Sequence, residues 1–148
     1  MFEFKRVFFL SLLFVALSCA VDFSNKTDIT GTWIRYSVSA RNENIREELT
    51  IELSSGKFKN AEGKVDKTII PGKFTWNYFT DGKPDKNLSF SGSLQVSKSD
   101  FTVAFIPSDE LITPVVRNFI LTQFGENLSL VDVGNGDTTA VYLKKEDK

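Results

Sequence analysis

The stretch Gly31-Thr32-Trp33 opens a long series of segments in which apolar and polar residues alternate. A period of two is the pattern of a β-strand that has one face in a core and the other in water. The clearest case covers residues 45–53, Ile-Arg-Glu-Glu-Leu-Thr-Ile-Glu-Leu, in which one face is apolar apart from Glu47 near its start. The sequence therefore predicts strands rather than helices from residue 29 onward.

The strand pattern repeats to the end of the chain, with turn signals rich in Gly, Asn, Asp and Pro between the repeats. The other predicted strands cover residues 31–38, 57–59, 74–78, 88–96, 101–105, 115–124, 128–133 and 138–144. We expect eight to ten short antiparallel strands in an all-β domain. A sandwich and a barrel both bury so many one-faced strands, and the sequential hairpins favour an antiparallel up-and-down β-barrel.

Three breaks interrupt the alternation. Pro71-Gly72 is expected to separate two strands, and Gly92 within its strand indicates a bend or bulge. Residues 107–114, Pro-Ser-Asp-Glu-Leu-Ile-Thr-Pro, form the longest break; one helical turn fits after Ser108, and Pro114 prevents a longer helix.

The composition excludes several classes of function. The chain has 148 residues, no histidine and one cysteine, so it cannot build a Ser-His-Asp or Cys-His site or an internal disulfide. The formal net charge is −1, and the chain has no run of basic residues that would suit binding to nucleic acid. Glu47 has an inward position in the pattern, and Asp132 could face inward or outward. Nothing places these two carboxylates at the spacing of a glycosidase pair. We expect a single-domain monomer that is not an enzyme and needs no cofactor or metal.

The N-terminus has the pattern of a secretion signal. Residues 1–18 carry Lys5 and Arg6 and then an apolar run that is shorter than the ~20 residues of a membrane span. Residues 16–19, Ala-Leu-Ser-Cys, resemble a bacterial lipobox, which implies that Cys19 is acylated, for instance with palmitate, and that residues 19–28 form a lipidated tether. Alternatively, cleavage after Ala20 would release a soluble protein. The first reading predicts a lipoprotein of the bacterial cell envelope, anchored in the outer membrane.

The Gly-x-Trp at the first strand, the meander and the basic last strand together resemble the calycin group, in particular bacterial lipocalin-like lipoproteins. The resemblance implies that residues 29–148 form one lipocalin-like barrel and that Trp33 plugs its closed end. It also implies a basic partner across that tryptophan, which Lys144 or Lys145 would supply. Gly31 would let the incoming chain turn tightly, and the Trp33 indole N–H would find a backbone carbonyl.

Aromatic side chains are the candidates for a ligand site. Small barrels are filled by side chains or leave room for one small ligand. The predicted ligand-binding residues are Tyr36, Phe74, Trp76, Tyr78, Phe90 and Phe105, with Phe101 as a further inward-facing residue. The pattern is equally compatible with core packing. Three functions follow: binding of a small hydrophobic ligand, recognition of another protein through loops such as 107–114, and inhibition of proteases.

Overall fold

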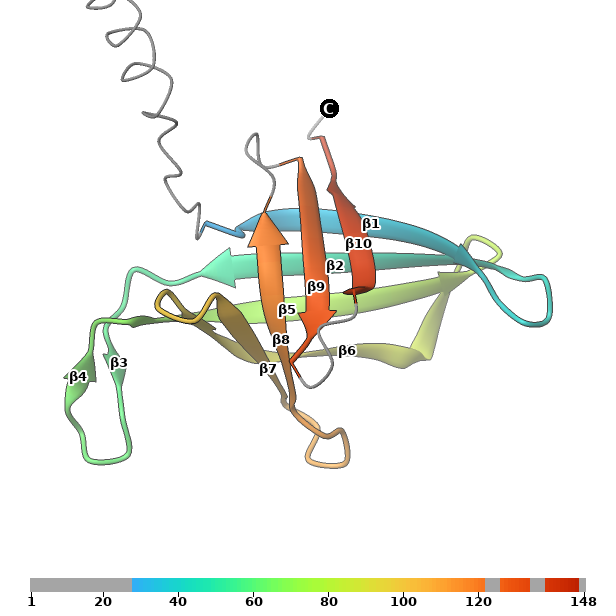
Figure 1. The fold of residues 1–148 in the computed structure, drawn as a ribbon. Helices are drawn as coiled ribbons and strands as arrows, with labels where there is room; N and C mark the ends of the chain where they lie inside the picture. Colours follow the sequence, from blue (N-terminus) through green and yellow to red (C-terminus); the bar gives the residue numbers. More distant parts are fainter. Residues whose placement is uncertain (1–27, 122–125, 134–137, 147–148) are drawn as a thin grey trace, which may run out of the picture.

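The computed structural model describes residues 28–121, 126–133 and 138–146, so Cys19 and the predicted signal lie outside the described residues. The strands are β1 (Gly31–Val38), β2 (Asn44–Leu53), β3 (Phe58–Lys59), β4 (Val65–Asp66), β5 (Ile69–Thr80), β6 (Lys83–Ser97), β7 (Thr102–Pro107), β8 (Val115–Leu121), β9 (Asn127–Asp132) and β10 (Thr138–Lys144). Eight of them form a closed antiparallel barrel in the order β1-β10-β9-β8-β7-β6-β5-β2, and β3 and β4 form a separate hairpin (Figure 1). The predicted up-and-down barrel is confirmed. In the described part of the chain no helix could span a membrane.

The barrel is uneven in shape. Figure 1 shows β1, β2, β5 and β6 as long strands that run across the view, while β8, β9 and β10 cross them steeply. β1 pairs with β2 along its whole length, from Gly31 opposite Ile51 to Val38 opposite Asn44. Its recorded pairing with β10 covers only Trp33 opposite Lys144 and Ile34 opposite Leu143. The barrel therefore closes at the start of β1, and the far half of β1 extends beyond the crossing.

Pro71-Gly72 does not separate two strands, and this prediction is wrong. Both residues lie inside β5, which runs unbroken from Ile69 to Thr80. The pairing of β2 with β5 ends at Gly72, so Pro71 is paired across the sheet with Gln95 of β6 and not with a residue of β2. Such an edge position tolerates the missing N–H of proline.

Gly92 serves a close approach rather than the predicted bulge. The irregularity between β5 and β6 lies instead between Trp76 and Tyr78. A Cβ atom on Gly92 would overlap the carbonyl oxygen of Ile106 and would lie 2.8 Å from Cα of Pro107. The backbone of β7 can therefore cross β6 here only because the residue is glycine.

The turns between strands follow their local sequence. Asp81 and Gly82 have φ values of 47° and 77°, which fit the two-residue turn typical of β-hairpins. In the segment 107–114 the N–H of Ile112 donates to the carbonyl of Asp109 at 3.1 Å, which is one hydrogen-bonded turn. This turn agrees with the limit that Pro114 sets.

Trp33 is a core residue near the start of β1, and we call it the Trp33 plug after its expected role. Its side chain is fully buried, and its indole N–H donates to the carbonyl of Ile29 at 2.9 Å. Lys144 Nζ lies 5.6 Å from the centre of the Trp33 ring, so Lys144 is the basic partner, whereas Lys145 contacts Glu48 at 3.7 Å. Gly31 has a φ of 131°, and the Lys144 side chain lies 3.3 Å from the position of its missing Cβ.

Candidate functional site

The candidate site lies inside the barrel, one step along the strands from the Trp33 plug. Pairing across three strands places Arg35 opposite Glu47 and Glu47 opposite Tyr78. The preceding row, Trp33, Leu49 and Trp76, belongs to the core or packs against it. Side chains two residues apart on a strand share a face. Arg35, Glu47 and Tyr78 therefore point inward, toward the end of the barrel opposite the Trp33 plug, which we call the mouth.

Glu47 is the centre of a buried polar network. It is 7% exposed, although carboxylates are rarely buried without partners. The hydroxyl of Tyr142 on β10 donates to Glu47 Oε2 at 2.7 Å, and Arg35 Nη1 lies 3.4 Å from Oε1. A short hydrogen bond and a nearby guanidinium offset the cost of burying the carboxylate.

The two tyrosines of this network hold their protons tightly. Burial, together with the negative charge of Glu47, raises the pKa of Tyr78 to about 12. Burial, the charge of Glu47 and the hydrogen bond to it also raise the pKa of Tyr142 well above its usual range. Both phenols are therefore neutral near pH 7, where they act as hydrogen-bonding groups rather than as bases or nucleophiles.

An aromatic cluster surrounds Trp76 beside this network. The ring of Trp76 stacks on Tyr78 at 6.4 Å and on Phe90 at 5.6 Å between centroids. Phe105 lies at 5.3 Å, and Tyr142 makes an edge contact at 6.2 Å. Trp76 Nε1 is buried without a hydrogen-bond partner. A buried N–H donor without an acceptor is costly, so this atom has capacity for a bond that the protein itself does not supply.

The structure brings together five of the six predicted ligand-binding residues. Phe74 makes edge contacts with the rings of Phe90 and Phe105 at 5.8 and 5.1 Å and so joins the cluster around Trp76. The prediction of Tyr36 as a ligand-binding residue is wrong. Its side chain is 69% exposed and lies on the outer face, because the face of β1 that carries Trp33 points inward. The predicted inward position of Phe101 holds, although its ring contacts Phe119.

Sequence reasoning missed Arg35 and Tyr142 as members of the site. Tyr142 lies 95 residues after Glu47, so no local spacing could connect them. The only available signal was that Arg35 shares a face of its strand with Trp33 and that Glu47 lies on an otherwise apolar face. The other carboxylate considered, Asp132 on β9, is opposite Arg117 on β8.

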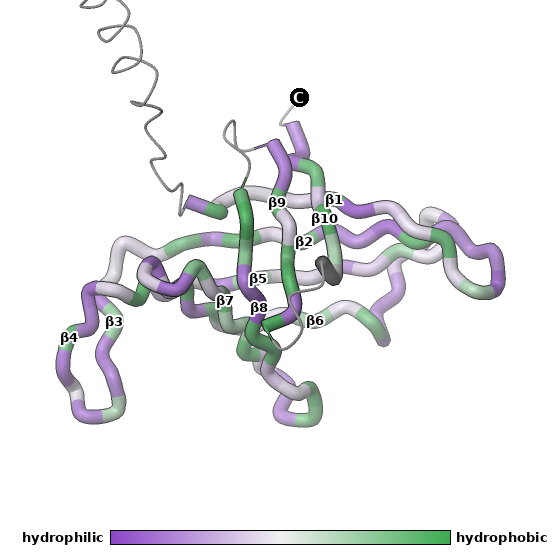
Figure 2. The backbone as a smooth tube through the Cα atoms, in the orientation of Figure 1, coloured by the Kyte–Doolittle hydropathy of each residue, from purple (hydrophilic) through white to green (hydrophobic). Residues whose placement is uncertain are grey.

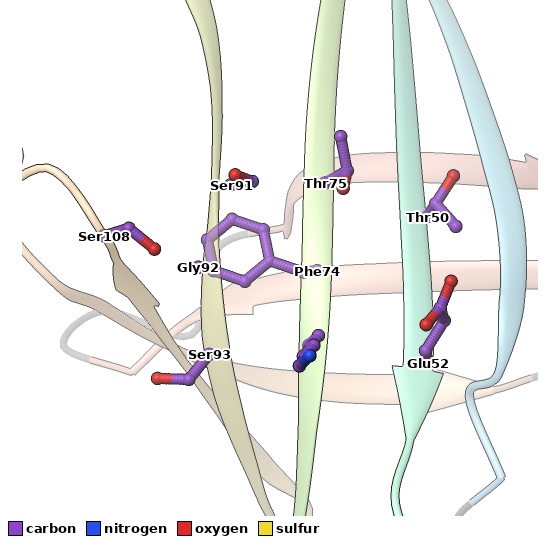
Figure 3. Close-up of a pocket in the computed structure, with 9 residues that line it drawn as sticks. Thr50, Glu52, Phe74, Thr75, Ser91, Gly92, Ser93 and Ser108 are labelled. Carbon is purple, nitrogen blue, oxygen red and sulfur yellow. The ribbon is translucent and has the colours of Figure 1, made fainter.

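A hollow separate from the candidate site lies on the outer face of β2, β5 and β6 (Figure 3). It has a volume of about 420 Å³, and its lining is mainly hydroxyl-bearing side chains with one acid and one base: Thr50, Glu52, Lys73, Thr75, Ser91, Ser93 and Ser108. Phe74 and Gly92 complete the lining. Thr50, Thr75 and Ser91 form one row across the strands. This hollow is shallow and polar, and the sequence did not predict it.

The described residues, 28–121, 126–133 and 138–146, contain no group of three or more His, Cys, Asp or Glu side chains placed to hold a metal ion. Comparisons with protein-family models, with curated proteins and with solved structures find no significant match. The functional argument therefore depends on the geometry of the barrel, which is consistent with a lipocalin-like fold.

Proposed function

We propose that the protein is an exported, lipid-anchored binding protein, not an enzyme, which holds a small and mostly apolar ligand at the mouth of its barrel. The observation that carries this proposal is the aromatic cluster around Trp76, whose buried N–H has no partner. Ligand sites are typically lined by apolar and aromatic side chains with a few polar groups that orient the ligand. Trp76, Tyr78 and Phe90 are all partly exposed, so a ligand can reach them.

The polar groups indicate what such a ligand carries. The Trp76 N–H needs an acceptor, and the Arg35 side chain is 34% exposed beside Glu47. A ligand with an apolar body and one acceptor oxygen would cover the rings and satisfy the indole N–H. Satisfying a buried donor is worth about 1–3 kcal/mol, which corresponds to a gain in affinity of roughly 5- to 150-fold.

Binding by a variant that lacks only the N–H tests this proposal. Trp76→Phe keeps an aromatic ring, and Trp33→Phe is the matched control at the closed end. Native mass spectrometry of the purified protein detects a copurified molecule, and titration with anilinonaphthalene sulfonate gives a dissociation constant. We expect Trp76→Phe to weaken binding about tenfold and Trp33→Phe to leave it nearly unchanged. Equal binding by wild type and Trp76→Phe would count against the site.

The membrane anchor is the second part of the proposal. The sole cysteine stands where the apolar run of the signal ends, which supports acylation of Cys19 and a position in the bacterial envelope, on the outer membrane. More than one acyl chain would make the anchor stable, whereas a single chain binds only marginally. Cleavage after Ala20 is the alternative and would give a soluble, secreted protein.

One observation favours a second candidate function, recognition of another protein by a loop. Leu111, in the turn between β7 and β8, is 93% exposed. A fully exposed leucine on a turn is suited to insert into a pocket of a partner. Crosslinking in cells tests this function: Leu111→Asp should abolish a specific adduct, and an unchanged adduct would exclude the loop.

A further inference from the structure

The outer surface of the barrel has two unlike halves. On β1, β8, β9 and β10 the exposed outward side chains include Tyr36, Val38, Val116, Ile120, Val141 and Leu143, which are 48–69% exposed. We call these six residues the apolar face. No described outward position on these four strands carries a charge, because Arg35, Arg117, Asp132 and Lys144 occupy the inward positions.

The other half of the outer surface, on β2 and β5, is charged and can be compared with the apolar face. The outward positions of β2 and β5 carry Arg46, Glu48, Glu52 and Lys73, as expected for an antiparallel sheet with one face in water. In Figure 2, green, apolar segments of β8, β9 and β10 alternate with paler and purple ones, whereas the hairpin after β1 is mostly purple. A contiguous exposed apolar surface with a polar rim indicates an interaction site, whereas single apolar residues scattered over a surface do not.

The register places the β1 and β10 members of the apolar face near one another, whereas Ser129 on β9 separates Ile120 from Val141. Leu143 is directly opposite Ile34 on β1, and Val141 follows two positions along the same face of β10. Tyr36 and Val38 continue the row along β1, each about 6.6 Å from the previous side chain. Arg46 pairs with Tyr36 across β2 and forms the charged rim. The face therefore has a charged boundary on β2 and uncharged residues within.

We propose that the apolar face lies on the surface of the lipid bilayer. This inference rests on the lipid anchor of the proposed function, because the tether determines what the face can meet. The tether, residues 20–28, spans at most ~30 Å when fully extended. The described chain begins at Asp28 and enters β1 beside the end of β10, where the Lys144 side chain packs against Gly31. The apolar face starts at Leu143, the next residue of β10, and at Tyr36, five residues further along β1.

Tethering to the membrane allows even a weakly binding apolar face to stay on the lipid surface. A short flexible tether holds the domain at an effective concentration of about millimolar relative to the membrane. Burying an uncharged face in the interfacial region requires no charge to be desolvated. The phenol of Tyr36 has the amphipathic character of residues found at membrane interfaces.

The test replaces the acyl chains with a synthetic tether, so that its result is independent of Cys19. All barrel strands and the core lie within residues 29–144, so a chain that starts at Asp22 contains the folded unit. A hexahistidine tag at its N-terminus holds it on vesicles of neutral phosphatidylcholine that contain a few nickel-chelating lipids. The reporters are Tyr36→Trp on the apolar face and Thr75→Trp on the polar half, and brominated phosphatidylcholine is the quencher. Circular dichroism checks that each variant folds.

We expect the bromine to quench the added fluorescence of Tyr36→Trp at least about twofold more than that of Thr75→Trp, because interfacial burial is ~5–10 Å deep. The difference should persist from ~0.1 M to ~1 M salt, because the face is uncharged. Val141→Glu in the Tyr36→Trp protein should abolish it.

Equal quenching of the two reporters would overturn the inference. A second result would also overturn it. If Tyr36→Trp is not quenched and equilibrium sedimentation shows a dimer that Val141→Glu dissociates, then a second copy of the chain covers the apolar face. Detergent partition of the full chain tests Cys19 separately. If the full chain does not partition into detergent but the two tethered reporters still differ in quenching, the lipid anchor is refuted. The lipid affinity of the apolar face then stands.

Discussion

The hydrogen bond from Tyr142 to Glu47 yields the sharpest prediction about stability. Tyr142→Phe removes one hydroxyl and leaves the ring contact with Trp76 in place. Arg35, whose Nη1 lies 3.4 Å from Glu47 Oε1, then remains beside the carboxylate. Because a hydrogen bond to a charged group contributes about 1.5–3 kcal/mol, we expect the free energy of unfolding to fall by about 2 kcal/mol at pH 8.

The same substitution should change how stability depends on pH. The pKa of Tyr142 is raised in the folded protein above its ordinary value of 10.0. Above pH 10 the unfolded chain therefore loses a proton that the folded chain keeps, and stability falls by about 1.4 kcal/mol per pH unit. Tyr142→Phe has no such proton. The difference between wild type and variant should shrink to roughly 0.6 kcal/mol at pH 11.

Urea unfolding at pH 8 and pH 11, followed by tryptophan fluorescence, measures both effects. Tyr36→Phe is the matched control, because Tyr36 lies on the outer face and is 69% exposed. A double-mutant cycle with Glu47→Gln isolates the pairwise energy. The reasoning is refuted if Tyr142→Phe stays within about 0.5 kcal/mol of wild type at pH 8, or if the difference is the same at both pH values.

Three further changes test other parts of the molecule. Gly92→Ala places a methyl group against the β7 backbone and should lower the free energy of unfolding by about 1–3 kcal/mol or prevent folding, as read from urea midpoints. Lys144→Met removes the cation above Trp33 and should cost about 0.5–1 kcal/mol in the same assay, with Lys145→Met as the control that costs less. Cys19→Ser in the full chain, expressed in a bacterium, should block incorporation of labelled palmitate and processing of the signal; labelling equal to wild type would exclude Cys19 as the acylation site.

Much of the fold follows from local sequence. The period of two identifies the strands because each strand must bury one face, and the Asp81-Gly82 turn works because both residues tolerate positive φ. The family resemblance carried by Gly31 and Trp33 implied a basic partner from Lys144 or Lys145, and the structure has Lys144 above the Trp33 ring. Pro71 was misread because the sequence does not show that β2 ends beside it and leaves that side of β5 without a ladder partner.

The site depended far more on tertiary structure. Alternation divides β1 into two faces, each of which carries an aromatic residue, and sequence cannot tell which face is inside. Closure of the barrel decides it, because the Trp33 face packs against Leu49 and the core while Tyr36 is left in solvent. The sequence alone thus determined that this chain forms one-faced strands and where these strands approximately lie. Only the closed barrel brought Tyr142 to Glu47 across 95 residues, since cross-strand contacts depend on the register of distant strands rather than on spacing along the chain.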